Sequence, residues 1–357
     1  MNILYLINYL GGGGTEAYIY TLAKELKDSN NIYIAYSEKA NGYNKFKKLG
    51  VNLIHLPMNS PYDFKAARKL KEISKEYEID LIHSHFLREN AISVLAKLMG
   101  NRPRLINTRH MLLVNTGLTK YLNRFISRFD DYIIAVSRSV KELLYEELGR
   151  RDNIRLIYTG LDLASQASYD FREEMGLSPD TILITSTARF SKEKGHEFIV
   201  RSLPRLEELV HKDFRLVFIG DGPELNNIVN ISRGLGVYDR LIFTGYQEDI
   251  QSILNSSDIF LLASETEAFG ISILEAMATR LPVVATDSGG TCEIIPRDSD
   301  YGILIDYGDQ EALATSLSSL ILDPDLRRHY GEAGHKLVAE KFNLKDTIRE
   351  TYSLYSK

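Results

Sequence analysis

The chain has 357 residues, of which 44% are hydrophobic and 25% are charged, and this balance is ordinary for a globular protein that builds sizeable cores. Its length is about twice that of a common domain, so we expect two domains. The single cysteine, Cys292, excludes an internal disulfide and indicates a reducing compartment.

The N-terminal run "MNILYLINYL" has no basic residue, and Asn2 and Asn8 interrupt its apolar side chains, so we expect no signal peptide. No stretch reaches the length of about 20 apolar residues that a membrane-spanning helix needs. We therefore expect a cytoplasmic protein, and a peripheral position at the cytoplasmic face of the inner membrane is left open.

The net charge of −5 is unevenly distributed along the chain. Residues 1–160 contain 24 Lys and Arg against 16 Asp and Glu, whereas residues 161–357 contain 19 against 32. A basic first half and an acidic second half suggest two domains with different partners. Unevenly distributed solvating charge is the alternative, and no nucleic-acid partner is expected.

Short β-rich runs alternate with helical periods throughout the chain. The runs of the first half cover residues 2–7, 31–37, 52–57, 79–85, 104–110 and 131–137, and those of the second half cover 181–188, 214–220, 240–245, 258–264, 281–287 and 301–306. Strands that alternate with helices predict parallel βαβ units, and the near-continuous apolar runs of the second half are typical of strands covered on both faces.

The predicted fold class is therefore α/β, with two doubly wound parallel-sheet domains. We place the first domain at residues 1–162 and the second at 163–340, with the joint near 158–170 and a C-terminal helix at 341–357 that is able to cross back to the first domain. Ligands of such sheets bind at the carboxyl ends of the strands, so two facing domains would form a deep cleft between them.

The first strand-end loop, "YLGGGGTEAY", brings four glycines to the start of a helix, where backbone N–H groups can approach a phosphate. Its spacing is not GxGxxG, and no acidic residue ends the next strand, which argues against a nicotinamide dehydrogenase. A flexible loop with no ligand is the alternative.

Two strand-end loops of the second half have the composition of a phosphate site. In "ARFSKEKGHEF", Arg189 and Lys194 are two cations beside a helix start, which suits a diphosphate, although a solvated basic loop has the same composition. In "FIGDGPEL", Gly220 and Gly222 suit either a phosphate or base loop or an ordinary turn.

The stretch "ETEAFGISILEAM" places Glu267 and Glu275 on either side of a predicted helix start at Gly270. Carboxylates accept hydrogen bonds from sugar hydroxyls, and the helix start offers free amides, so the stretch matches a nucleotide sugar with hexose, diphosphate and ribose in that order. The alternative is that Glu275 caps or pairs locally and that Glu267 is a solvated loop residue.

These features together resemble a known family, the retaining glycosyltransferases of the GT-B fold in glycosyltransferase family 4. The resemblance covers nearly the whole chain and is carried by Gly13-Gly14-Thr15-Glu16, Arg189 through Lys194-Gly195, Gly220-Asp221-Gly222, Glu267-x7-Glu275 with Phe269-Gly270, and "LPVVATDSGG". It departs from the family pattern in Ala268, Arg280 and Thr159, none of which removes a proposed ligand group.

The resemblance implies a role for each matching residue. Three glycines would approach the donor, namely Gly13, Gly14 and Gly220, and its diphosphate would be held by Arg189 and Lys194. The sugar hydroxyls would be bound by Glu267 and the ribose by Glu275, while backbone amides would come from Phe269, Gly270 and Ile271. His110 would be the histidine near the transferred sugar. His85 is a weaker candidate, since a histidine at a strand end is as often structural.

The implied reaction is the transfer of a hexose or related sugar from a nucleoside diphosphate, UDP being the favoured one, with retention of configuration. The acceptor would be a glycan or a lipid-linked molecule in the synthesis of cell-surface polysaccharide or glycolipid. Neither a metal nor another cofactor is expected, because the two cations neutralise the leaving group and Asp298-Ser299-Asp300 reads as a turn. A nucleotide-sugar epimerase of the same fold and a non-catalytic nucleotide-sugar-binding subunit are the alternatives.

The segment 118–129, "LTKYLNRFISRF", combines an apolar side with Lys120, Arg124 and Arg128, and the helix of residues 64–75 is also basic. A basic amphipathic segment in a basic domain fits peripheral contact with an anionic membrane. Ordinary packing of these helices on the sheet is the alternative.

Overall fold

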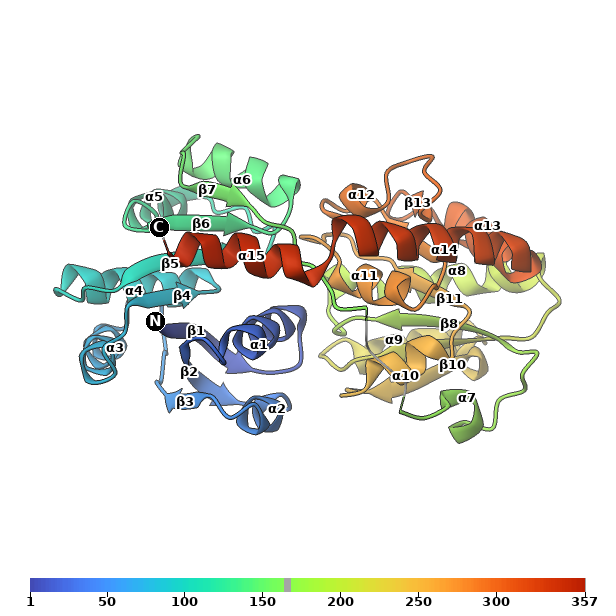
Figure 1. Cartoon of the computed structure of the whole chain (residues 1–357). Coiled ribbons are helices and arrows are strands. Elements are labelled where there is room, and N and C mark those ends of the chain that lie inside the picture. Colours follow the sequence, from blue (N-terminus) through green and yellow to red (C-terminus); the bar gives the residue numbers. More distant parts are fainter. Residues whose placement is uncertain (164–167, 357) are drawn as a thin grey trace. The chain divides into compact units, whose positions relative to one another are not determined.

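The computed structural model describes residues 1–163 and 168–356, so part of the predicted joint, residues 164–167, lies outside the described residues. The chain divides into two compact units (Figure 1). One contains Met1–Thr159 and the segment from Thr347 onward, and the other is Gly160–Asp346. The boundaries at 159/160 and 346/347 differ by three and six residues from the expected ones at 162/163 and 340/341.

The first unit contains a seven-stranded sheet of order β3-β2-β1-β4-β5-β6-β7, in which every neighbouring pair is parallel. Its strands are β1 (Asn2–Leu10), β2 (Asn31–Lys39), β3 (Asn52–His55), β4 (Leu81–Ser84), β5 (Arg104–Arg109), β6 (Tyr132–Ala135) and β7 (Ile154–Leu156). Its helices are α1 (Gly14–Leu26), α2 (Tyr43–Lys48), α3 (Phe64–Glu76), α4 (Leu87–Leu98), α5 (Gly117–Ile126), α6 (Arg138–Leu148) and α15 (Leu344–Tyr355).

The C-terminal helix α15 is part of the core of this first unit (Figure 1). Leu354 and Tyr355 are buried in the same cluster as the side chains of β1 and β2. Arg104, at the start of β5, donates from Nη1 to the carbonyl of Tyr355 at 2.9 Å. The last helix therefore covers a sheet to which the chain contributed its first strands.

The second unit contains a six-stranded parallel sheet of order β10-β9-β8-β11-β12-β13. Its strands are β8 (Ile182–Thr187), β9 (Phe214–Ile219), β10 (Leu241–Gly245), β11 (Ile259–Leu262), β12 (Val283–Thr286) and β13 (Ile303–Ile305). Its helices are α7 (Phe171–Glu174), η1 (Lys192–Lys194), α8 (His196–Leu209), α9 (Leu225–Gly234), η2 (Tyr238–Arg240), α10 (Ile250–Asn255), α11 (Ile271–Ala278), α12 (Thr291–Ile294), α13 (Gln310–Leu322) and α14 (Pro324–Lys341).

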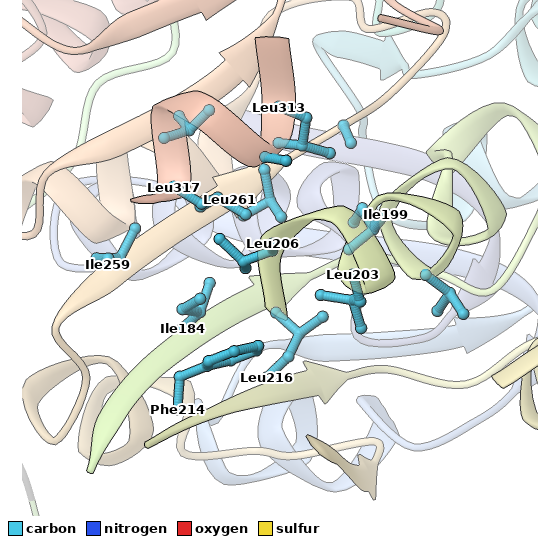
Figure 2. Close-up of a cluster of buried hydrophobic side chains, with 14 of the residues drawn as sticks. Ile184, Ile199, Leu203, Leu206, Phe214, Leu216, Ile259, Leu261, Leu313 and Leu317 are labelled. Atoms are coloured by element: carbon cyan, nitrogen blue, oxygen red, sulfur yellow. The ribbon is translucent and has the colours of Figure 1, made fainter. Parts of the chain in front are cut away.

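Figure 2 shows the largest core of the second unit. Leucines and isoleucines of α8 and α13 pack on the alternate side chains of β8, β9 and β11 that face them. The labelled members are Ile184, Ile199, Leu203, Leu206, Phe214, Leu216, Ile259, Leu261, Leu313 and Leu317. Removal of these apolar side chains from water supplies most of the free energy that holds a sheet and its covering helices together. The predicted fold class is confirmed: each unit is a doubly wound parallel α/β sheet.

None of the helices in the described part of the chain is both long enough and apolar enough to cross a bilayer.

Candidate functional site

The strand order of each sheet reverses at one point, between β1 and β4 in the first unit and between β8 and β11 in the second. Loops that leave the carboxyl ends of strands on either side of such a switch point diverge and form the usual binding crevice of open α/β sheets. Gly13 and Gly14 follow β1, His85 follows β4, Lys194 follows β8 and Glu267 follows β11. These predicted residues thus fall in the four loops at the two switch points.

Lys194 and Glu267 form an ion pair in the second unit. Nζ of Lys194 lies 2.7 Å from Oε2 of Glu267, and the two side chains are 23% and 16% exposed. The hydroxyl of Ser264 donates to the same carboxylate oxygen at 3.4 Å. The structure therefore brings together the lysine predicted to bind phosphate and the glutamate predicted to bind the sugar.

The backbone around this pair fixes the lysine loop on the glutamate loop. Gly195 has a φ of +69°, and a Cβ built on it would lie 1.9 Å from the carbonyl oxygen of Ala263. Beside this contact, the amide of Glu265 donates to the carbonyl of Glu193 at 2.8 Å. Only glycine fits such a backbone conformation and such an approach without strain. The position of Lys194 is thus set by main-chain contacts.

The loop after β12, which contains the predicted "SGG" sequence, holds the other side of Glu267. The amide of Glu267 donates to the carbonyl of Ser288 at 2.7 Å, and the amide of Gly290 donates to the carbonyl of Glu267 at 2.9 Å. Two reciprocal backbone hydrogen bonds leave this residue little freedom. Its carboxylate is therefore pre-positioned, which lowers the entropy lost when a ligand binds.

Helix α11 begins directly after the glutamate loop. Its N-cap, Gly270, has a φ of +101°, and no side chain caps the helix start. Phe269 is only 2% exposed, and its ring contacts that of Phe342 at 5.6 Å between centroids. Ile271 is the first helical residue, and Glu275 is half-buried in the second turn. This matches the predicted local layout, while the ligand roles of these residues stay predictions.

Arg189 and Gly220 lie in the same region but differ in environment. Arg189 is exposed, and its charge contributes to lowering the pKa of the Glu193 carboxyl. Gly220 packs against the loop that follows β8, where a Cβ built on it would lie 2.2 Å from the carbonyl oxygen of Ala188. The segment around Asp221 accepts a hydrogen bond from the amide of Phe190 at 3.0 Å. The described contacts give Gly220 a packing role, and its predicted contact with the donor is untested.

His196, next to this site, was not predicted. Its ring stacks on that of Phe190 with 4.1 Å between centroids, and neither ring nitrogen has a hydrogen-bond partner in the described part of the chain. Burial, and then the charge of Lys194, lower the pKa of His196 to about 4. The residue is therefore neutral near pH 7 and does not add a second cation beside Lys194. Its position in the sequence, directly after Gly195 in the predicted phosphate loop, could have identified it as a candidate.

In the first unit, half-buried His110 adjoins the buried pair His83 and His85. Nε2 of His110 lies 3.1 Å from Nδ1 of His85, so one of the two nitrogens donates to the other. Nδ1 of His83 is 2.6 Å from the hydroxyl of Tyr355, and its Nε2 is 2.7 Å from that of Thr108. Burial lowers the pKa of both His83 and His110 to about 3. The sequence pattern predicted His110 and His85 as candidates but missed His83.

The glycine loop after β1 contains an internal acceptor, Glu16. Burial raises the pKa of its carboxyl, and hydrogen bonds from the backbone amides of Glu16 itself, Gly11 and Gly13 oppose this effect. Some of the amides that the loop could offer to a phosphate therefore already bind a carboxylate. The predicted contact of Gly13 and Gly14 with the donor stays a prediction.

The comparisons with known proteins agree with these features. Residues 168–337 match the family model described as "Glycosyl transferases group 1", and residues 12–165 match that described as "Glycosyltransferase Family 4". The N-acetyl-α-D-glucosaminyl L-malate synthase of Bacillus anthracis is 30% identical over 319 residues, which cover 87% of this chain and 83% of that protein. The α-monoglucosyldiacylglycerol synthase of Streptococcus pneumoniae is 26% identical over 371 residues, which cover 95% and 82%.

Among solved structures, HepE from Anabaena, crystallised with UDP and glucose, superposes with a TM-score of 0.88 and 20% identity, and the match covers 100% of this chain and 99% of that one. At this identity the likeness shows the fold.

Proposed function

Because the chain belongs to the family 4 glycosyltransferases of the GT-B fold, we propose that it transfers a hexose or related sugar from UDP to a glycan or lipid-linked acceptor, with retention of configuration. One observation carries the proposal: Lys194 and Glu267 meet at 2.7 Å at the switch point of the second sheet. A cation and a carboxylate in one place suit a ligand that joins a phosphate to a polyol.

The proposed reaction depends mainly on stabilisation of the leaving group. As the bond from the anomeric carbon to UDP breaks, negative charge accumulates on the β-phosphate. Main-chain contacts fix the backbone of Lys194, and its ammonium would stabilise that charge by exchanging Glu267 for the phosphate. The exposed guanidinium of Arg189 would bind the same group. We propose that these two cations replace a metal in this role.

The carboxylates and the histidine would act as binding groups. Glu267 would accept hydrogen bonds from the sugar hydroxyls, and Glu275 would accept them from the ribose. His110 is neutral near pH 7 because burial lowers its pKa to about 3, so it would orient a polar group as a hydrogen-bond partner and would not supply positive charge. Two-carboxylate hydrolysis is not implied, since Glu267 is paired with Lys194.

The acceptor is proposed as lipid-linked or membrane-proximal. The relative from Streptococcus pneumoniae is named as a synthase of a glucosylated diacylglycerol, which supports this acceptor class. The basic first half of the chain supports peripheral contact with an anionic membrane. We place the protein on the cytoplasmic side because its one cysteine is consistent with a reducing compartment.

The test uses the purified full-length chain and a panel of nucleotide sugars, with products identified by mass spectrometry. The proposal expects UDP release that is lost in Lys194→Ala and that persists in EDTA. Isomerisation of a UDP-sugar without acceptor would indicate an epimerase. Binding of UDP-sugars with no turnover in the presence of lipid and glycan acceptors would indicate a non-catalytic subunit. Loss of activity in EDTA that manganese restores would refute the metal-independent mechanism.

A further inference from the structure

Helix α5 in the first unit exposes part of its apolar side, although Leu122 and Ile126 are half-buried and Ile126 packs against the core. Asn123 is the buried residue of the helix, at 5% exposure, whereas Leu118, Tyr121 and Phe125 are 73%, 71% and 48% exposed. These three side chains are spaced by three and four residues, so they form one stripe along the helix. An amphipathic surface helix normally buries such a stripe.

Polar groups of α5 and of its C-cap form buried hydrogen bonds with the rest of the first unit. Arg109, at the end of β5, donates from Nη2 to Oδ1 of Asn123 at 2.7 Å and to the hydroxyl of Ser127 at 3.4 Å. Asn123 in turn donates from Nδ2 to the carboxylate of Glu147 at 2.6 Å. Arg109 is 7% exposed and Glu147 is 6% exposed, so the loss of these partners would leave buried charges unsatisfied. The orientation of the helix is therefore enforced.

The segment that leads into α5 also exposes large apolar side chains. Met111, Leu113 and Val114 are 57%, 51% and 67% exposed. Together with Leu118, Tyr121 and Phe125 they form what we call the α5 patch: six large apolar side chains exposed within 15 consecutive residues. Exposed apolar side chains concentrated in one short segment are typical of an interaction surface.

The charges around the α5 patch select the partner. Residues 111–129 contain Lys120, Arg124 and Arg128 and no Asp or Glu. Arg151 adds a further cation at the end of the helix, where it donates to the carbonyls of Ser127 and Arg124 at 3.1 and 3.3 Å. Apolar side chains that project from a basic rim match an anionic bilayer, in which the side chains enter the interface and the cations meet the headgroups.

We propose that the α5 patch is a docking surface that inserts into the interface of an anionic lipid bilayer. The inference deepens the proposed function and rests on its lipid-linked or membrane-proximal acceptor, because the patch lies after the carboxyl end of β5, on the same edge of the sheet as His110. A bilayer bound there brings a membrane-embedded acceptor to the loops of the first switch point.

The test is sedimentation of the full-length chain with vesicles of phosphatidylcholine, with and without phosphatidylglycerol, at low and high salt. The wild type is expected to bind the anionic vesicles, and the binding should weaken with salt. The combined variant Leu118→Ser, Tyr121→Ser, Phe125→Ser is expected to lose about tenfold in affinity per side chain. The matched control is Leu98→Ser, Met99→Ser, because these residues are also exposed, at 55% and 39%, and lie outside the patch.

The variant should keep the circular dichroism spectrum and the melting temperature of the wild type, since the three side chains are exposed. Equal vesicle binding by the variant and the wild type would overturn the inference, as would no binding by the wild type at low salt. A concentration-dependent dimer that the variant abolishes, without vesicle binding, would overturn it in favour of self-association. Vesicle binding is read without turnover, so an inactive protein that still binds through the patch would refute only the proposed transfer.

Discussion

The ion pair between Lys194 and Glu267 predicts opposite effects of two substitutions on UDP binding. Lys194→Ala would remove the proposed charge-assisted hydrogen bond to the diphosphate, which is worth about 1.5–3 kcal/mol, so UDP affinity should fall about 10- to 150-fold. Glu267→Gln removes the carboxylate that competes with the diphosphate for Lys194. The side chains are 23% and 16% exposed, so the pair lies between surface and buried cases and contributes about 1 kcal/mol. UDP should then bind up to about fivefold more tightly.

Isothermal titration calorimetry with UDP and with UDP-glucose distinguishes these effects. Glu267→Gln should lower the preference for UDP-glucose over UDP and lower turnover, because a neutral amide holds sugar hydroxyls less strongly than a carboxylate. In a Lys194→Ala background the same substitution should no longer tighten UDP binding. Glu265→Gln, the same charge change on an exposed side chain of the same loop, is the control. Unchanged or weaker UDP binding by Glu267→Gln would refute the competition.

Three further predictions concern other parts of the two units. Glu275→Gln should weaken UDP binding about tenfold but leave 2′,3′-dideoxy-UDP unaffected, and equal losses by calorimetry would contradict a ribose contact. Burial in the folded state lowers the pKa of His110 to about 3, whereas its pKa in the unfolded chain is about 6.5. As the pH falls from 6.5 towards 3, the unfolded chain binds a proton that the folded chain does not, so the free energy of unfolding decreases by at most about 1.4 kcal/mol per pH unit. The free energy of unfolding of His110→Gln in urea should therefore depend less on pH between 7 and 5 than that of the wild type, and equal slopes would refute this. Gly195→Ala should lower the free energy of unfolding in urea by several kcal/mol, because its Cβ would clash with the carbonyl of Ala263. Gly236 is the control, since it has a similar φ of +75° and no atom within 4 Å of its Cβ position, and Gly236→Ala should cost only about 1–2 kcal/mol. Equal costs would exclude the predicted clash.

The strands of both sheets were predictable because parallel strands covered on both faces leave near-continuous apolar runs. The run predicted at 301–306 shortens to β13, Ile303–Ile305, and β7 was missed because the three residues "IRL" at 154–156 are too few to show a period. It could also be predicted that the loops of Lys194 and Glu267 are neighbours, because the order of strands and helices makes β8 and β11 adjacent strands. The ion pair between the two side chains was not, because it depends on the backbone contact of Gly195 with Ala263.

The orientation of α5 could not be predicted from its own sequence. A hydrophobic period shows that a helix has an apolar side, but it does not show which side faces the protein. Here the deciding group is Arg109, whose guanidinium is buried and needs acceptors from Asn123 and Ser127. Turning the helix to bury its exposed apolar side chains would break these bonds and leave the charges of Arg109 and Glu147 buried and unsatisfied. Contacts of this kind, distant in sequence, carry no local signal.

Both elements predicted to bind phosphate already contain an internal counter-group. The carboxylate of Glu16 accepts hydrogen bonds from the amides of the glycine loop, and that of Glu267 pairs with Lys194. Partly buried donors and cations would otherwise cost free energy in the unliganded chain. A phosphate that reaches either element must therefore exchange with a carboxylate, and its binding free energy is the difference between two similar interactions. In the proposed reaction such an exchange would favour turnover, because Lys194 would regain Glu267 as the nucleoside diphosphate leaves and no tight product complex would form.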